Sequence, residues 1–171
     1  MSFLARTIAR AKWDRREGLA ALEIPADAVT VDLRTNDNTL SFWTCGDARE
    51  EDVRRVVLAF AAAGQRIDRV DVIWVARSAF EERSIVLRNT EGKTPILVLK
   101  GDHVDVKHLD LARLGVVATQ VALALREGRY KRFTREEVIS LLADAVSADL
   151  VALDALQELV QADVSAKLKD R

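Results

Sequence analysis

One segment of the sequence, residues 126–135, combines dense positive charge with aromatic rings. Guanidinium and ammonium groups bind phosphate oxygens, and exposed rings stack on unpaired bases, so this composition favours a nucleic acid as ligand. The same pattern is also typical of a hinge whose rings anchor a tail while its bases neutralise an acidic body. The contacts to nucleic acid are expected from Arg126, Arg129, Tyr130, Lys131, Arg132 and Arg135.

A second basic segment lies at the N-terminus. Residues 1–16 hold five bases against one acid, and residues 126–135 have the same balance, although the net charge of the chain is −1. Two basic islands on an acidic body attract an anionic partner even when the net charge is near zero. The N-terminal segment either joins the basic patch, lies on an anionic membrane surface or forms a solvated helix. Of these, we expect no membrane partner.

A third candidate surface is apolar and lies in the last third of the chain. The spacing of apolar residues there predicts two short amphipathic helices. Two such helices bury little area against each other, so they need either the body of the protein or another chain as cover. Partner contacts are expected from Leu153, Leu156, Val160 and Val164. The sequence thus favours a protein partner or a homo-oligomer.

Both histidines fall in one cluster with carboxylates, but the set does not suit a metal ion. His103 and Asp105 flank Val104 on an expected strand and share its outward face, whereas His108 has the opposite parity. A divalent ion needs several ligands that converge on one point and are held there by further contacts. We therefore expect no metal site and no cofactor.

No catalytic motif is recognisable. Glu91 and Lys93 match the E-x-K fragment of metal-dependent nucleases, but those enzymes carry it along a strand and here it occupies a turn. Cys45 has no neighbouring base, and no glycine-rich phosphate loop is present. Asp32 and Asp71 would serve an enzyme only if the fold brought them together. The sequence favours a non-enzymatic interaction module for a protein partner, with nucleic-acid binding as the alternative.

Composition places the chain among globular proteins. Of its 171 residues, 49% are hydrophobic and 31% charged. No apolar run approaches the roughly 20 residues that cross a bilayer. A single cysteine suits a reducing compartment, so we expect a cytoplasmic location. Abundant Ala, Arg and Asp with few aromatic residues is typical of a bacterial gene rich in G and C.

The expected fold class is α+β, a mixed sheet packed by helices and followed by a C-terminal helical hairpin. Residues 1–24 predict a loosely amphipathic helix that ends at Pro25. Alternating apolar residues at 29–34 and 40–45, separated by turn residues, predict a β-hairpin.

The middle of the chain predicts a crossover between two strands. Apolar residues at helical spacing, Phe60 among them, predict a helix that ends at Gly64, and residues 70–76 follow as a strand buried on both faces. Strand 40–45, this helix and strand 70–76 have the length of a right-handed βαβ unit. At least one parallel pairing is therefore expected in the sheet.

A second hairpin and a long helix are expected next. Residues 85–88 and 96–100 flank a turn-rich segment, and residues 104–106 are expected to add a short edge strand. Asp110 is the expected cap of a helix that stops at Gly128.

Beyond Arg129 no strand is expected. Thr134 and Glu137 form a capping box that begins one helix, and a second helix follows residues 147–149. The sequence thus predicts two parts, an α+β body at residues 1–128 with an N-terminal basic helix, and a C-terminal helical hairpin appendage at residues 129–171.

Overall fold

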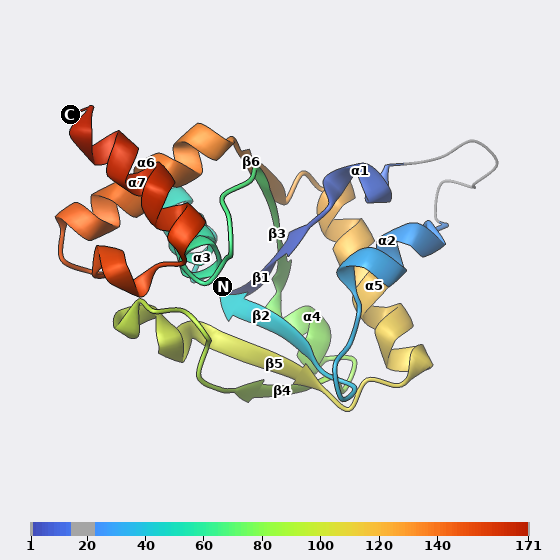
Figure 1. Ribbon diagram of the computed structural model, residues 1–171. Helices are drawn as coiled ribbons and strands as arrows, with labels where there is room; N and C mark the ends of the chain where they lie inside the picture. The colour runs from blue at the N-terminus through green and yellow to red at the C-terminus, as the bar shows by residue number, and fades with distance from the viewer. Residues whose placement is uncertain (1, 15–22, 171) are drawn as a thin grey trace.

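The computed structural model describes residues 2–14 and 23–170. These residues form a six-stranded sheet with helices on both faces (Figure 1). The strands are β1 (Phe3–Ile8), β2 (Leu40–Thr44), β3 (Val70–Ala76), β4 (Val86–Asn89), β5 (His103–Lys107) and β6 (Tyr130–Phe133). The helices are α1 (Arg10–Trp13), α2 (Ala26–Asp32), α3 (Glu50–Ala62), α4 (Arg77–Glu81), α5 (Leu111–Arg126), α6 (Arg135–Ser147) and α7 (Glu158–Lys169), with 3-10 turns η1 (Leu97–Asp102) and η2 (Leu153–Ala155). The α+β class and the C-terminal helical pair are confirmed.

Strand β1 lies in the middle of the sheet. The strand order is β4-β5-β2-β1-β3-β6, and β1 pairs antiparallel with β2 on one side and with β3 on the other. Leu4 and Ala5 are both fully buried and belong to different cores, because successive side chains of a strand point to opposite faces. The N-terminus of the chain therefore supplies a central element of the fold.

The helix expected over residues 1–24 is wrong for residues 3–8, which form β1. Leu4 and Ile8 are four residues apart, a spacing that places two side chains on one side of a helix and equally on one face of a strand. Burial of Ala5 on the opposite face follows the strand period. In the described part, only α1 is helical here, and residues 15–22 of the expected helix lie outside it.

The expected strand at residues 29–34 is also wrong, because helix α2 occupies most of it. Alternating β-branched residues favoured a strand, yet burial follows the helical period. Ala28 and Asp32, four residues apart, are buried, whereas Val31 is 51% exposed. Pro25 precedes the helix, a position in which its fixed φ and missing amide hydrogen are harmless. The first predicted hairpin is thus a helix followed by β2.

The crossover prediction is right in connection and wrong in pairing. Helix α3 connects β2 with β3, which run in the same direction because both are antiparallel to β1. Since β1 lies between them, they do not pair with each other, and every strand pairing of the described sheet is antiparallel. The length of the connection between β2 and β3 does not reveal that a strand from the N-terminal part of the chain lies between them.

The second predicted hairpin forms with a different second strand. Strand β4 pairs with β5, and residues 96–100, expected as a strand, enter the 3-10 turn η1. Ile96 and Leu99 are buried there at the three-residue spacing of a 3-10 helix. Strand β5 lies between β4 and β2 and not at the edge. Helix α5 is confirmed, and the Asp110 side chain caps it by accepting a hydrogen bond from the Arg113 amide at 2.8 Å.

Two apolar cores lie on the two faces of the sheet. Helices α3, α6 and α7 cover one face, and α2, α4 and α5 cover the other (Figure 1). Strand β3 contributes to both, with Val72 in the first core and Ile73 in the second. Among the described residues, no helix combines the length and the apolar character needed to cross a membrane.

The C-terminal part contains a strand that was not expected. Residues 130–133 form β6, an edge strand that pairs with β3. Helix α6 then begins with the predicted capping box at Thr134, and α7 packs against it. Leu156, Val160 and Val164 are buried in the core that α3 shares. Most of the apolar stripe of the tail is therefore covered by the chain itself, whereas Leu159 on α7 is 62% exposed.

The central position of β1 predicts a large cost for truncating it. Leu4→Ala removes a fully buried side chain and should lower the free energy of unfolding in urea by about 2–5 kcal/mol. Leu111→Ala is the matched control, because Leu111 is 89% exposed, and it should change that free energy by less than about 0.5 kcal/mol. Similar losses in both variants would contradict a central β1.

Candidate anion-binding cleft

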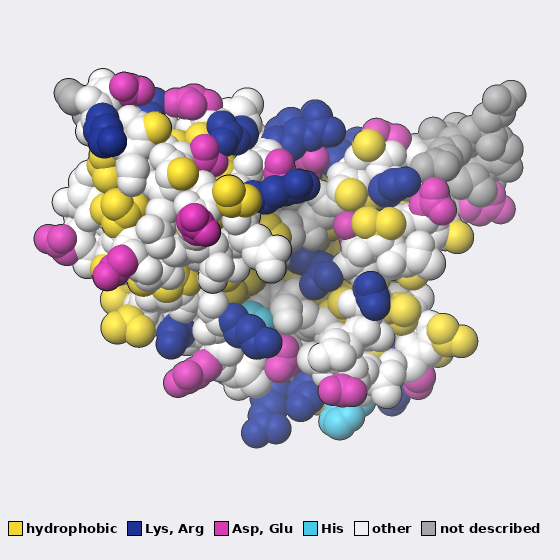
Figure 2. All heavy atoms as spheres, viewed as in Figure 1, with side chains coloured by type: hydrophobic (Ala, Val, Ile, Leu, Met, Phe, Trp, Pro, Cys, Tyr) yellow, Lys and Arg dark blue, Asp and Glu magenta, His cyan; other side chains and the backbone are white. Residues whose placement is uncertain are grey.

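An open cleft of about 700 Å³ lies where β1 ends and β3 begins. Four basic residues line it, from α1 and from the loop before β3: Arg10, Lys12, Arg66 and Arg69. In Figure 2, Lys and Arg side chains gather in the hollow between the lobe of α6 and α7 and the lobe of α1 and α2. The cleft therefore collects cations that are far apart in the sequence.

A second hollow of about 440 Å³ adjoins this cleft on the other side of the loop before β3. Arg66, Arg69 and Phe60 line both hollows, so the two meet around this loop. Phe60 is 44% exposed, although its spacing on α3 predicted a place on the apolar face. We call the two hollows together the basic groove.

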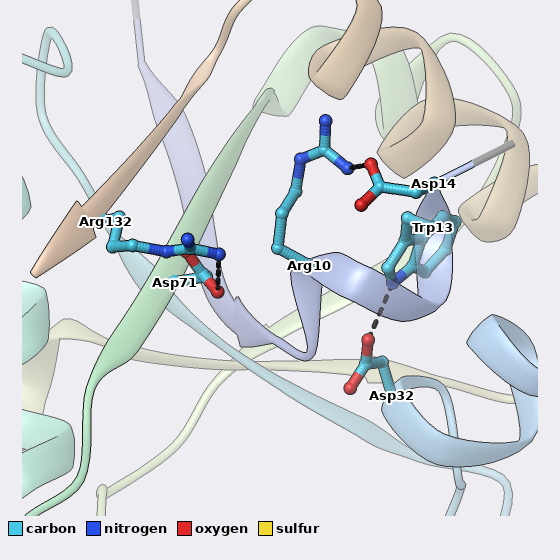
Figure 3. A network of polar contacts seen from close by, with 6 residues as sticks. All are labelled: Arg10, Trp13, Asp14, Asp32, Asp71 and Arg132. Atoms are coloured by element: carbon cyan, nitrogen blue, oxygen red, sulfur yellow. Dashed lines mark hydrogen bonds and ion pairs between the residues drawn. The ribbon is translucent and has the colours of Figure 1, made fainter.

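A buried carboxylate holds one further cation at the groove. Asp71 on β3 is only 7% exposed and lines the cleft. It accepts two hydrogen bonds from Arg132 on β6, from Nε at 2.7 Å and from Nη2 at 3.1 Å (Figure 3). These hydrogen bonds and the charge of Asp71 raise the pKa of Arg132. Strand register makes the pair, because Asp71 and Arg132 are directly opposite each other.

A second buried carboxylate, Asp32 at the end of α2, anchors α1. Its oxygens accept from the Ala9 amide at 2.9 and 3.0 Å and from the indole Nε1 of Trp13 at 2.6 Å (Figure 3). Its backbone carbonyl accepts from Nε of Arg6 at 2.9 Å. Asp32 and Asp71, the two carboxylates that would need the fold to bring them together, both line the cleft.

An arginine and an aromatic ring connect α1 with β6. The guanidinium of Arg10 lies 5.1 Å from the ring centre of Tyr130, within the range of a cation–π contact. Arg10 also forms an ion pair with Asp14 (Figure 3). Tyr130 is 38% exposed and shares its face of β6 with Arg132. The N-terminal basic segment and the predicted patch at residues 126–135 thus meet at this face.

The rest of the predicted patch points elsewhere. Lys131 faces the opposite side of β6 and contacts Glu50 at 2.9 Å. Arg129 pairs with Glu127, and Arg126 lies at the end of α5. Arg135 binds the Ile67 carbonyl in the loop before β3 and pairs with Asp163. Of the six predicted contact residues, Tyr130 and Arg132 therefore lie beside the cleft.

Phe60, Arg66 and Arg69 line both hollows and are not among the residues predicted to contact nucleic acid. The two arginines are isolated bases in a loop, with no aromatic or basic neighbours to draw attention to them. Phe60 looked like one more apolar residue of an amphipathic helix. Only the arrangement of α3 beside the start of β3 brings these side chains to the groove.

The histidine cluster and Cys45, the other candidates for chemistry, do not form a site. Nδ1 of His103 lies 2.8 Å from the Thr90 hydroxyl, and burial lowers the pKa of His103 against the opposing charge of Asp105. Within the described residues, no three His, Cys, Asp or Glu side chains form a group suited to a metal ion. Burial, together with the nearby charge of Asp52, raises the pKa of the Cys45 thiol to about 12, which suits an inert structural thiol.

The E-x-K fragment lies far from its expected carboxylate. Glu91 and Lys93 follow β4 at one edge of the sheet, whereas Asp71 lies on β3, beyond β5, β2 and β1. Both side chains are exposed, and neither lines the groove. The set does not have the arrangement that metal-dependent phosphodiester cleavage requires.

Comparisons with models of protein families, with curated proteins and with solved structures found no significant match to this chain. The groove, its cations and the carboxylates beneath them are therefore the observations from which a function is inferred.

The bond between Trp13 and Asp32 predicts a measurable stability loss. Trp13→Phe leaves most of the buried ring but removes a donor to a buried carboxylate, which should lower the free energy of unfolding by about 1.5–3 kcal/mol. Trp74→Phe is the matched control, because among the described residues the Trp74 indole donates to no carboxylate. Urea unfolding of both variants checks this, and a smaller loss for Trp13→Phe than for Trp74→Phe would refute the anchoring role of Asp32.

Proposed function

We propose that this protein binds nucleic acid through the phosphate backbone, in the basic groove, and carries out no catalysis there. The observation that carries the proposal is the convergence of cations from three separate segments on one open cleft. Arg10 and Lys12 come from α1, Arg66 and Arg69 from the loop before β3, and Arg132 from β6. A phosphate backbone offers a row of anions that matches such a spread of positive charge.

Arg10, Lys12 and Arg66 form ion pairs with the exposed acids Asp14, Asp27 and Asp68, whereas two other cations, Arg69 and Arg132, support the proposal by their availability. Arg69 is exposed, lines both hollows and forms no ion pair within the described part of the chain. Arg132 uses Nε and Nη2 on Asp71, and because a guanidinium has five N–H donors, its remaining donors are free of that carboxylate. A guanidinium held in this way loses little side-chain entropy on binding phosphate.

Of the described carboxylates, three line the cleft: Asp68 is exposed and paired with Arg66, and the two buried ones, Asp71 and Asp32, support a role without catalysis. A general base must have a lone pair directed at the proton that it removes. Asp71 is engaged by two hydrogen bonds from Arg132, and Asp32 by the Ala9 amide and the Trp13 indole. Both carboxylates therefore fix the orientation of neighbouring groups, and a binding surface requires such fixed groups.

A protein partner or a second copy of the chain is the second candidate function. The tail residues Leu156, Val160 and Val164 are already buried within the chain, and Leu153 is partly buried. The observation that still favours a partner is apolar surface that the chain leaves exposed, on η1 and on α7. Leu97 and Val98 on η1 are 73% and 65% exposed, and Leu159 on α7 is 62% exposed. We rank this second because nothing on that surface specifies what covers it.

Nucleic-acid binding is tested by fluorescence anisotropy with single-stranded oligonucleotides at several salt concentrations. Wild-type affinity should fall steeply as salt rises, because bound phosphates release counterions. Replacing Lys12, Arg66 and Arg69 together by Ala should weaken binding at least about ten-fold and flatten the slope of log K against log salt by about two units. Arg66 and Arg69 are exposed and Lys12 is half-buried with its side chain 41% accessible, so the fold should be retained.

The matched control changes the net charge equally but away from the groove. Arg88, Lys93 and Lys169 are exposed, and none lines either hollow. Their joint replacement by Ala should leave the salt slope close to that of the wild type. Equal losses in the two triple variants would show non-specific attraction, and no binding at low salt would leave the protein-partner function.

A further inference from the structure

We propose that the nucleic acid bound in the basic groove is single-stranded and that one of its bases stacks on the ring of Phe60. The inference rests on the proposed function, since it names the form of nucleic acid that the same groove takes. It also gives a role to a residue that neither the core of the protein nor its ion pairs require.

Phe60 is out of place for a core residue. Its neighbours on α3, Val56, Val57 and Ala61, are buried, whereas Phe60 itself is 44% exposed. Large aromatic rings are usually buried, because removing their surface from water is strongly favourable. A half-exposed ring at the point where two hollows meet therefore presents apolar area to the place that a ligand would occupy.

Phe60 differs from the other ring at this site in its contacts. Tyr130 has the guanidinium of Arg10 against it at 5.1 Å. Within the part of the chain that the structure describes, no ring or guanidinium stacks on Phe60. Arg66 and Arg69 line the same two hollows as Phe60, so a ligand in these hollows would meet both the ring and the cations.

This combination distinguishes a single strand from a duplex. In a duplex the bases stack on each other, and their faces are not available to a protein ring. An unpaired base can leave its neighbours and stack on an aromatic side chain while adjacent phosphates bind cations. Phe60, Arg66 and Arg69 line the same hollows and so offer both kinds of contact to one strand. The two adjoining hollows, of about 700 and 440 Å³, provide concave space for a flexible strand.

The test compares three ligands of equal charge. They are a thymidine strand of about twelve nucleotides, an abasic strand of the same length and a hairpin duplex with the same number of phosphates. Affinities of wild-type protein, Phe60→Leu and Phe60→Tyr are measured by anisotropy at one fixed salt concentration. Phe60→Leu keeps an apolar side chain without a ring, and Phe60→Tyr keeps the ring. Thermal melting of each variant confirms that it is folded.

The wild type should bind the thymidine strand at least about five-fold more tightly than the abasic strand, because stacking contributes about that much per base. Phe60→Leu should remove most of this difference and leave affinity for the abasic strand unchanged. Phe60→Tyr should retain the difference. The duplex should bind no more tightly than the abasic strand.

Two failures are distinguishable. If the wild type binds thymidine and abasic strands equally, or if Phe60→Leu has no effect on either, the stacking inference is overturned while phosphate binding in the groove stands. If the wild type binds none of the three ligands at low salt, the proposed function is overturned together with the inference. Tighter binding of the duplex than of the thymidine strand would also overturn the inference.

Discussion

The fold and the groove both depend on strand β1, which is hydrogen-bonded on both edges and buried on both faces. Its pairing with β2 and β3 places the first residues of the chain in the middle of the sheet. Where β1 ends, the chain turns into α1, and Asp32 binds the Ala9 amide and the Trp13 indole at that turn. The strand that organises the two cores thus also delivers Arg10 and Lys12 to the cleft.

Two buried carboxylates hold neighbouring groups in position beside the groove. A buried carboxylate is costly unless it is paired or hydrogen-bonded, so Asp71 requires a partner. Arg132 from the edge strand β6 provides that partner and is thereby held at the edge of the cleft. Asp32 acts on α1 in the same way through neutral donors. Asp71 and Asp32 thus hold in position the guanidinium of Arg132 and the indole of Trp13.

Elements with strong end signals and long apolar stripes could be predicted from the sequence. Asp110 and Thr134 cap α5 and α6 as their positions indicate, and β3 has the continuous apolar run of a strand buried on both faces. Short elements with ambiguous spacing could not be predicted. Leu4 and Ile8 fit a helix and a strand equally, and four residues at 130–133 are too few to show a period.

The residues of the candidate site also differ in how clearly the sequence marks them. Tyr130 and Arg132 stand in a segment whose composition marks it, so the sequence alone made them candidates. Arg66, Arg69 and Phe60 carry no local signal, because their relation to the groove is tertiary. The tail residues Val160 and Val164 show the opposite case, since an apolar stripe does not reveal whether its cover is the same chain or another. The spacing of apolar residues predicts the apolar face of a helix, but only the tertiary structure shows what packs against that face.

Mapping the amide chemical shifts of the protein during titration with a short single strand tests the central claim most directly, because it locates the bound strand. The account predicts shift changes concentrated at residues 7–12, 60–71 and 130–132, which surround the groove. Changes concentrated instead at η1 and α7, or a spectrum unaltered by the strand at low salt, would contradict it.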